Sequence, residues 1–502
     1  MSAKILSRLE GVSGKTRAFM LAAFGAFATL SLPPYHCLFA GAAGFSLFFL
    51  ACFSGETTAK RGFKDGMAFG YGFFLAGLYW IAVALTVETE RFFWLIPVAV
   101  LGIPLVMSQY AGIAGAACGG FSAKYRGFCG RLVVFIGCWT ALEWLRGALF
   151  SGFPWNLVGY SLASSPALLQ TASLGGIWAL SALALILFLL PAALAGVACR
   201  RASIPLGLAL IACALGAAGG ACVYGKHRLE ANPTRFVPDV KLRVVQPNIP
   251  QTLKWDPKER YGHLQLLRQL SETSDPKVKY VLWPESAMPY MMTDNMEAAE
   301  WMAESAPFGG GVIAGAVRGK LNESGRIEEV RNSVVVVDRA GRVVDYYDKS
   351  HLVPFGEYVP LRRIFPFISK ITDGLVDFSA GDGPRTVRVP GVPPFSPLVC
   401  YEIIFPGRVA LRGGNRPNFI VNVTNDAWYG HTSGPYQHFA AAIVRAVEEG
   451  LPVVRAANNG ISGVIDPLGR VREKTELGTR GIMDIKLPEP LDAPPLFARM
   501  GR

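Results

Sequence analysis

The part of the chain that follows residue 225 contains one cysteine, Cys400, although the sequence of 502 residues has nine. Cys400 therefore has no local partner for a disulfide or for a cysteine-based metal cluster. A lone cysteine at the end of a strand is a candidate nucleophile. A small buried hydrophobic residue is the more common role of a cysteine, so both roles stay open at this point.

Several motifs that indicate other types of catalytic or binding site are absent from the sequence. There is no P-loop, no G-x-G-x-x-G, no H-E-x-x-H and no G-x-S-x-G, and Ser286 and the six histidines form no recognisable Ser-His-Asp set. We therefore expect chemistry that uses neither a cofactor nor a metal ion. The net charge of +12 is compatible with nucleic-acid binding, but the sequence shows neither a basic face nor a binding motif, so no nucleic-acid partner is expected.

Charged residues are also missing from long stretches of the first half. Residues 18–55 contain no Lys, Arg, Asp or Glu. Because about 20 apolar residues cross a bilayer once, this stretch is long enough for two spans, with Pro33-Pro34 marking the turn. Five more spans are predicted within residues 66–87, 92–123, 132–150, 168–197 and 204–224. Residues 1–225 are thus predicted to be a transmembrane domain of about seven helices.

The distribution of Lys and Arg predicts the orientation of this domain. The N-terminal segment and the loops after the second, fourth and sixth spans carry the basic clusters, whereas the other loops carry almost none. The positive-inside rule then places the N-terminus in the cytoplasm. After an odd number of crossings, residues 226–490 lie on the outer side of the membrane, and residues 491–502 form a C-terminal tail.

The second half has the pattern of one α/β domain after a charged linker over residues 226–238. Strands mixed with helices over this length are typical of that class. Arg339-Ala340-Gly341 indicates a hairpin between two of the strands. Strands are expected at 241–246, 279–283, 312–317, 333–338, 342–347, 396–399, 418–423, 453–456, 462–466 and 470–473, and helices at 257–272, 295–305 and 435–449.

Three residues with complementary chemistry follow directly after predicted strands: Glu285, Lys349 and Cys400. In α/β domains such strand ends line the functional crevice. A glutamate can accept the proton of a cysteine, and a lysine can stabilise the oxyanion of an attacked carbonyl. Taken singly, each has an ordinary alternative: a solvated glutamate, a solvated lysine and a buried cysteine.

The segments around these residues resemble a known superfamily. Residues 283–287 (WPESA), 348–360 (DKSHLVPFGEYVP) and 399–402 (VCYE) are similar to the nitrilase, or carbon–nitrogen hydrolase, superfamily. The resemblance implies an α-β-β-α sandwich with a Glu-Lys-Cys triad. Carried over by motif, Cys400 is the nucleophile, Glu285 the general base and Lys349 the oxyanion stabiliser.

The same resemblance implies roles for further residues. Glu357 matches an acidic residue that supports the lysine, and Glu402 one that helps to hold the site. Trp255, Tyr401 and Trp428 resemble pocket and lid residues, although core packing is an equally good explanation for aromatic side chains.

A nitrilase-like domain behind a multi-span membrane half resembles the apolipoprotein N-acyltransferase family of the bacterial inner membrane. Members usually carry one more span after the hydrolase domain, and the sequence predicts none there. The resemblance implies transfer of an acyl chain from a membrane phospholipid, through a cysteine thioester, to the N-terminal amine of the diacylglyceryl-cysteine of apolipoproteins. The expected partners are phospholipid, lipoprotein and the bilayer.

Two other functions remain open from the sequence. A membrane-anchored nitrilase-type amidase would use the same triad, but seven spans are more than an anchor needs. A transporter or receptor with an outer ligand-binding domain would carry ionisable residues in several spans. The predicted spans contain mainly Glu143 and Arg146, one helical turn apart and expected to pair with each other.

Overall fold

The computed structural model describes residues 3–87, 92–124, 127–293, 297–360 and 376–500. These residues form two compact units, Met1–Ala231 and Asn232–Arg502, and each is described by itself. The charged segment 226–238 is not the linker that the sequence indicated. Helix α11 (Ile204–Ala231) extends into the first half of this segment, and strand β1 (Phe236–Gln246) begins before the segment ends.

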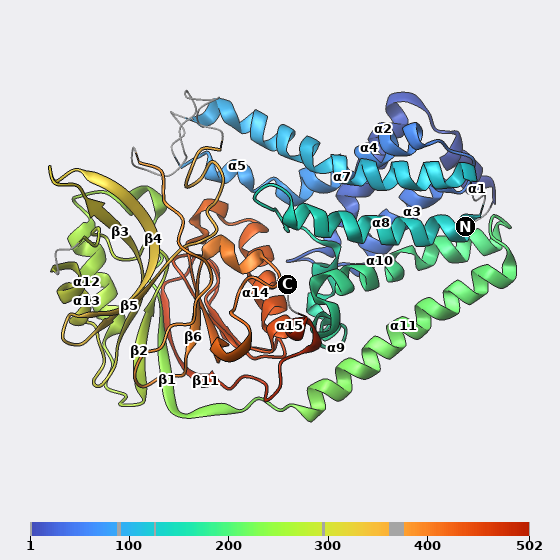
Figure 1. The fold of residues 1–502 in the computed structure, drawn as a ribbon. Helices are drawn as coiled ribbons and strands as arrows, with labels where there is room; N and C mark the ends of the chain where they lie inside the picture. The colour runs from blue at the N-terminus through green and yellow to red at the C-terminus, as the bar shows by residue number, and fades with distance from the viewer. Residues whose placement is uncertain (1–2, 88–91, 125–126, 294–296, 361–375, 501–502) are drawn as a thin grey trace. The chain divides into compact units, whose positions relative to one another are not determined.

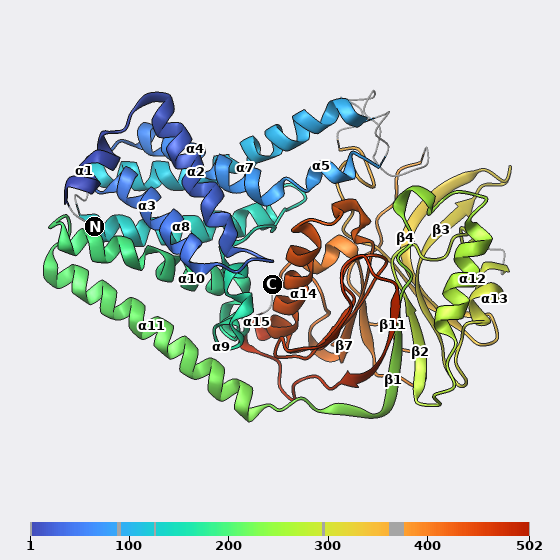
Figure 2. The same cartoon turned by 180° about the vertical axis from the view of Figure 1, so that it is seen from behind.

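The first unit is helical (Figures 1 and 2). Among the described residues, four helices are long and apolar enough to cross a membrane: Phe93–Phe121, Phe128–Ala148, Ala172–Ala198 and Ile204–Ala231. The helices in the first three predicted spans, α2, α3 and α4, are shorter or carry more charge. The helices have these bounds: α1 Ala3–Gly11, α2 Gly14–Ala28, α3 Leu38–Phe53, α4 Ala59–Leu78, α5 Ile81–Ala84, α7 Ile96–Lys124, α8 Phe128–Ala148, α9 Pro166–Leu169 and α10 Ala172–Ala198.

Small residues let helices α4 and α7 pack backbone against backbone. A Cβ atom on Gly62 would lie 2.1 Å from the carbonyl oxygen of Gly115, and the reverse substitution would meet Gly62 at the same distance. Such close approach is typical of helix packing in lipid, where polar backbone groups gain from near contact. A substitution at either glycine would separate the two helices.

Several buried charged side chains of this unit have polar partners within it. Arg17 forms a 2.7 Å ion pair with Asp65 on α4. Glu143 on α8 accepts a hydrogen bond from the backbone N–H of Val158 at 2.8 Å, and Arg146 donates to the carbonyl oxygen of Phe153 at 2.7 Å. Glu143 and Arg146 thus hold the segment that follows α8, because a charge inside a membrane domain needs such partners.

The second unit contains two sheets. The six-stranded sheet has the order β11-β1-β2-β3-β4-β5, and the five-stranded sheet has the order β10-β9-β8-β7-β6. Their strands are β1, β2 (Val278–Trp283), β3 (Gly311–Leu321), β4 (Ile327–Asp338), β5 (Val343–Asp348), β6 (Phe395–Val399), β7 (Phe419–Thr424), β8 (Val453–Ala457), β9 (Gly463–Ile465), β10 (Val471–Lys474) and β11 (Gly481–Pro488). The predicted hairpin is present as the antiparallel pair β4–β5. Strand β11, which pairs with β1, was not predicted.

Alternate residues of these strands face two different cores. Val244 on β1 belongs to the core shared by the two sheets, together with Val399 and Val421. Its neighbour Val245 packs on the opposite face with Leu264 of helix α12. This period of two lets both faces of the six-stranded sheet be buried.

Helices cover the outer faces of the sandwich. Helices α12 (Arg260–Ser271) and α13 (Glu297–Ala303) lie on the six-stranded sheet, and α14 (Gly434–Glu449) lies against β8 and β9 (Figures 1 and 2). Residues 295–296 of the predicted helix 295–305 fall outside the described residues. The unit therefore has the α-β-β-α layers that the resemblance implied.

Candidate active site

Cys400 occupies a strained turn at the end of β6. The strand ends at Val399, and Cys400 begins the short 3-10 helix η5 (Cys400–Ile404) with φ of +52°. A non-glycine residue in this conformation costs about 1–3 kcal/mol and persists only where its surroundings hold it. The residue is 5% exposed, so the turn presents a sulfur that is almost shielded from solvent.

Glu285 follows directly after β2, and two donors orient its carboxylate. The amide nitrogen of Asn332 donates to Oε1 at 2.8 Å, and the backbone N–H of Asn425 donates to Oε2 at 2.8 Å. Gly315 on the neighbouring strand makes room, because a Cβ there would lie 2.4 Å from the Cα of Glu285. Lys254, which is buried, donates to the backbone carbonyl of Glu285 at 2.9 Å.

Lys349 and Glu357 form a buried ion pair, with 2.9 Å between Nζ and Oε2. Glu357 also accepts from the amide nitrogen of Asn332 at 3.0 Å and from the backbone N–H of Val353 at 2.8 Å. Burial lowers the pKa of Lys349, but the charges of Glu357 and Glu285 outweigh it and the net pKa is raised. The lysine therefore stays an ammonium ion.

Glu402 ties the cysteine turn to the segment after Lys349. Its Oε2 accepts from the N–H of Val399 at 2.8 Å, and its Oε1 accepts from the hydroxyl of Tyr347 at 2.6 Å. The same Oε1 accepts from the backbone N–H groups of Ser350 at 2.9 Å and His351 at 3.1 Å. Burial raises the pKa of Glu402, while these donors favour its charged form.

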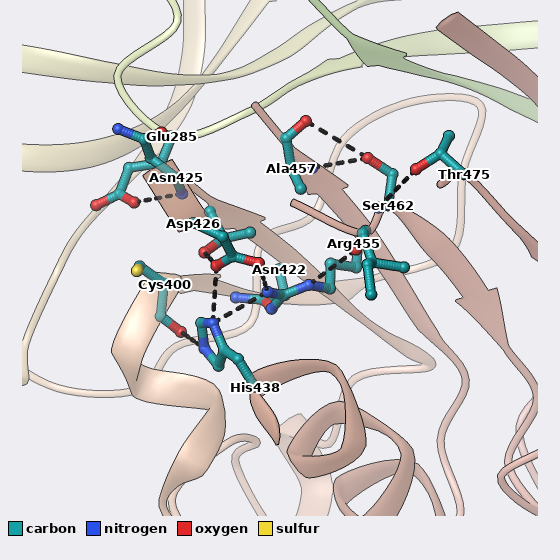
Figure 3. Close-up of polar contacts among 12 residues, drawn as sticks. Glu285, Cys400, Asn422, Asn425, Asp426, His438, Arg455, Ala457, Ser462 and Thr475 are labelled. Atoms are coloured by element: carbon teal, nitrogen blue, oxygen red, sulfur yellow. Dashed lines mark hydrogen bonds and ion pairs between the residues drawn. The ribbon is translucent and has the colours of Figure 1, made fainter. Parts of the chain in front are cut away.

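The electrostatics of Cys400 link these groups. Burial raises the pKa of its thiol to about 12, the charge of Glu285 adds to the effect, and the charge of Lys349 opposes it. The resting group is consequently a thiol rather than a thiolate. Figure 3 shows the sulfur on the side of Glu285, whereas the Cys400 carbonyl points to His438. A carboxylate here can take the thiol proton during attack, and the nearby ammonium can stabilise an oxyanion.

The three aromatic candidates lie in different environments. Tyr401 is buried and packs its ring 5.0 Å from that of Phe405, which is ordinary packing. Trp255, in a turn after Lys254, and Trp428, in the 3-10 helix η7 (Asp426–Tyr429), are half-buried. Neighbouring Tyr429 is buried, and the charges of Cys400, Asp426 and Glu285 all raise the pKa of its phenol in addition to burial.

Sequence reasoning missed several residues that the fold brings to this site. Asn332 stands within β4 without any motif, so only the structure shows that it bridges two carboxylates. Lys254 immediately precedes the candidate Trp255, and this position beside a candidate was the one sequence signal for Lys254. Among the described residues, no group of three or more His, Cys, Asp or Glu side chains is arranged to hold a metal ion.

Comparisons with known proteins match both halves of the chain. The profile described as carbon-nitrogen hydrolase matches residues 241–489, and the profile described as apolipoprotein N-acyltransferase N-terminal domain matches residues 24–190. The apolipoprotein N-acyltransferase of Rhodopseudomonas palustris is 38% identical over 510 residues, covering 97% of this chain and 92% of that protein. The chain belongs to the apolipoprotein N-acyltransferase family.

A second relative and a solved structure are also similar to the chain. The apolipoprotein N-acyltransferase of Brucella melitensis is 35% identical, with coverage of 98% of this chain and 93% of the relative. Among solved structures, Nit3 of Saccharomyces cerevisiae, a nitrilase superfamily member, is 18% identical with a TM-score of 0.38, covering 50% of this chain and 90% of that chain. The protein is thus a bacterial membrane acyltransferase with a nitrilase-like catalytic domain that contains Cys400.

Proposed function

We propose that this acyltransferase N-acylates apolipoproteins in two steps that share Cys400 as the acyl carrier. The observation that carries the proposal is the buried constellation of Glu285, the Lys349–Glu357 ion pair and the Cys400 turn. Asn332 joins the carboxylates of Glu285 and Glu357. The family membership supplies the reaction class.

In the first step, Cys400 attacks an acyl ester of a membrane phospholipid. Because the resting thiol holds its proton, Glu285 accepts this proton as the carbon–sulfur bond forms. The ammonium of Lys349 stabilises the oxyanion of the tetrahedral intermediate. The ester carbon–oxygen bond then breaks, Glu285 returns the proton to the leaving oxygen, and a lysophospholipid and a thioester remain.

In the second step, the free α-amine of a diacylglyceryl-cysteine attacks the thioester carbonyl. Glu285 takes a proton from this amine, Lys349 again stabilises the oxyanion, and the carbon–sulfur bond breaks. The thiolate of Cys400 regains a proton from Glu285, and the products are an amide on the lipoprotein and the free enzyme. A thioester suits this exchange because it keeps the acyl group reactive while one product leaves and the next substrate arrives.

The location proposed for the reaction follows from the charge pattern of the first half. Basic clusters at the N-terminus and after even-numbered spans support a cytoplasmic N-terminus and a periplasmic catalytic domain in the inner membrane. In this proposal residues 1–225 anchor the protein with about seven spans, residues 226–490 catalyse and residues 491–502 are a tail. Both substrates are lipid-anchored, so a tethered catalytic domain meets them at high effective concentration.

Trp255, Tyr401 and Trp428 are proposed to contact substrate near Cys400. The half-buried state of the two tryptophans supports this role, since a ring that is partly accessible can still cover an acyl chain. Tyr401 is more enclosed; it is proposed to contact the substrate and also packs the residues beside the nucleophile.

Intact-mass analysis of the purified enzyme with phospholipid tests the function. The wild-type protein should gain the mass of one acyl chain, and hydroxylamine should remove it. Cys400→Ala should gain none, whereas Cys37→Ala, which changes an exposed cysteine, should behave as the wild type. Adding a diacylglyceryl lipopeptide with a free amine should discharge the enzyme and acylate the peptide. Discharge to water at the same rate without the peptide contradicts the proposal.

A further inference from the structure

His438 lies behind the nucleophile turn and contacts its backbone. The residue belongs to α14 and is fully buried, with Nε2 3.1 Å from the carbonyl oxygen of Cys400. A carbonyl oxygen can only accept a hydrogen bond, so this geometry assigns the hydrogen to Nε2. The imidazole thus binds the carbonyl group of Cys400, the residue with the positive φ at the nucleophile turn.

Two charged residues fix the other side of this ring. Arg455 on β8 places Nη2 3.0 Å from Nδ1 of His438, and Asp426 places Oδ1 2.9 Å from the same nitrogen. Arg455 also forms a 2.8 Å ion pair with Asp426, and all three side chains are buried. Burial and the charge of Arg455 lower the pKa of His438, so the ring is neutral and Nδ1 accepts from Arg455. Asp426 then acts on the ring through its ion pair with Arg455, because a bare Nδ1 has no hydrogen to donate to the carboxylate.

The neighbour of Asp426 contacts the proposed general base. The backbone N–H of Asn425 donates to Oε2 of Glu285, while Asp426 faces His438 (Figure 3). These two consecutive residues at the end of β7 therefore connect the carboxylate of Glu285 with the imidazole that holds Cys400. A fixed frame of this kind sets the relative position of base and nucleophile.

The same view excludes His438 as the base for the thiol. Its Nε2 faces the carbonyl oxygen of Cys400, and the sulfur points away from the ring toward Glu285 (Figure 3). Nδ1 faces Asp426 and Arg455, so neither ring nitrogen is directed at the sulfur.

We propose that His438 is a positioning residue: held by Asp426 and Arg455, it donates to the Cys400 carbonyl and keeps the nucleophile turn aimed at Glu285. The proposal rests on the role of Cys400 as acyl carrier. It assigns a function in the reaction to a histidine that belongs to none of the three motifs.

The test compares acyl-enzyme formation in two variants of full-length enzyme with phospholipid. His438→Gln can place an amide N–H near the position of Nε2, whereas His438→Leu cannot donate. We expect a loss of at least about tenfold in the acylation rate for the leucine variant and a loss within about threefold for glutamine, with the phospholipid KM unchanged in both. The pH profile should keep its acidic limb in both variants, because Glu285 and not His438 moves the proton.

Ser462→Ala serves as the control for stability. Ser462, which directly precedes β9, donates to Gln246 of β1 in the other sheet at 2.6 Å, so its removal also deletes a buried hydrogen bond but leaves His438 untouched. If His438→Leu does not fold, His438→Asn replaces it, since its shorter amide does not reach the carbonyl.

Wild-type acylation by the variant that cannot donate, equal losses in that variant and in His438→Gln, or loss of the acidic limb would each overturn the role. The mass gain of the wild-type enzyme tests the function separately, so a failure of the function and a failure of this inference are distinguishable.

Discussion

The side-chain amide of Asn332 donates to Oε1 of Glu285 over 2.8 Å. The same nitrogen lies 3.0 Å from Oε1 of Glu357, the partner of Lys349. One amide therefore separates two buried carboxylates that would otherwise repel each other, and it keeps the proposed base and the proposed oxyanion stabiliser in one frame.

Replacing this amide with a third carboxylate should damage catalysis. In Asn332→Asp, like charges meet in a buried site, so one carboxyl group takes up a proton and Glu285 loses an orienting donor. We expect the rate of acyl-enzyme formation to fall by about 100-fold. The control is Asn322→Asp, the same chemical change in an exposed turn, which should keep the wild-type rate. Similar rates in the two variants would contradict the role of Asn332.

Lys254 should make stability depend on pH in an unusual direction. Burial lowers its pKa to about 8, although interactions with Glu285 and Cys400 act to raise it. The pKa of a lysine in the unfolded chain is about 10.4. Between these values the unfolded chain binds more protons, so this lysine's contribution to the free energy of unfolding rises with pH. At neutral pH the buried ammonium costs about 3 kcal/mol.

Lys254→Met removes that cost, and with it the donor to the Glu285 carbonyl. Its Tm at pH 7 should equal or exceed that of the wild type, the advantage should shrink as pH rises from about 8 to about 10, and acylation should fall by about tenfold. Lys279→Met is the matched control, because Lys279 also donates to a carbonyl, that of Pro276, but at a partly exposed position. A constant difference in Tm across this pH range would refute the assigned titration.

The thiol of Cys400 should resist alkylation near neutral pH. With its pKa raised to about 12 and the residue only 5% exposed, the fraction of reactive thiolate stays small from about pH 6 to about pH 9. Iodoacetamide followed by peptide mass analysis should modify exposed Cys37 first, and modification of Cys400 should increase only as pH approaches the raised pKa. Complete alkylation of Cys400 below neutral pH would instead show a resting thiolate.

Sequence patterns were informative where chemistry and local structure coincide. Glu285, Lys349 and Cys400 each follow a strand, and the motifs around them predict the sandwich that the structure contains. Strand β11 was not predicted, because it is an edge strand that is defined by its pairing with β1, more than 200 residues earlier in the chain. The sequence did not predict the roles of Asn332 and His438 for a related reason, because each acts through contacts with residues distant in the chain.

Helix length also differs from what hydropathy predicted. The charge-free stretch 18–55 indicated two spans of bilayer length, yet α2 and α3 have 15 and 16 residues. Residues around Pro33 form turns and a 3-10 segment, η1 (Thr29–Ser31), rather than a brief reversal between two long helices. Apolar composition shows which stretches can enter a membrane, but not how much of each stretch is helical.

Glu402 provides the sharpest test of how the cysteine turn is built. Its two oxygens accept from Val399, Tyr347, Ser350 and His351, so each of these contacts requires an acceptor. In Glu402→Gln, one side of the group becomes an NH2 donor that faces another donor. Leaving such a buried group unsatisfied costs about 1–3 kcal/mol, and the Tm should fall accordingly. Acylation should fall more than stability alone explains, because the segment after Lys349 loses its connection to Val399.

Glu329→Gln, in a partly exposed ion pair with Arg331, should change neither quantity measurably. If Glu402→Gln acylates at the wild-type rate, the carboxylate does not hold the turn.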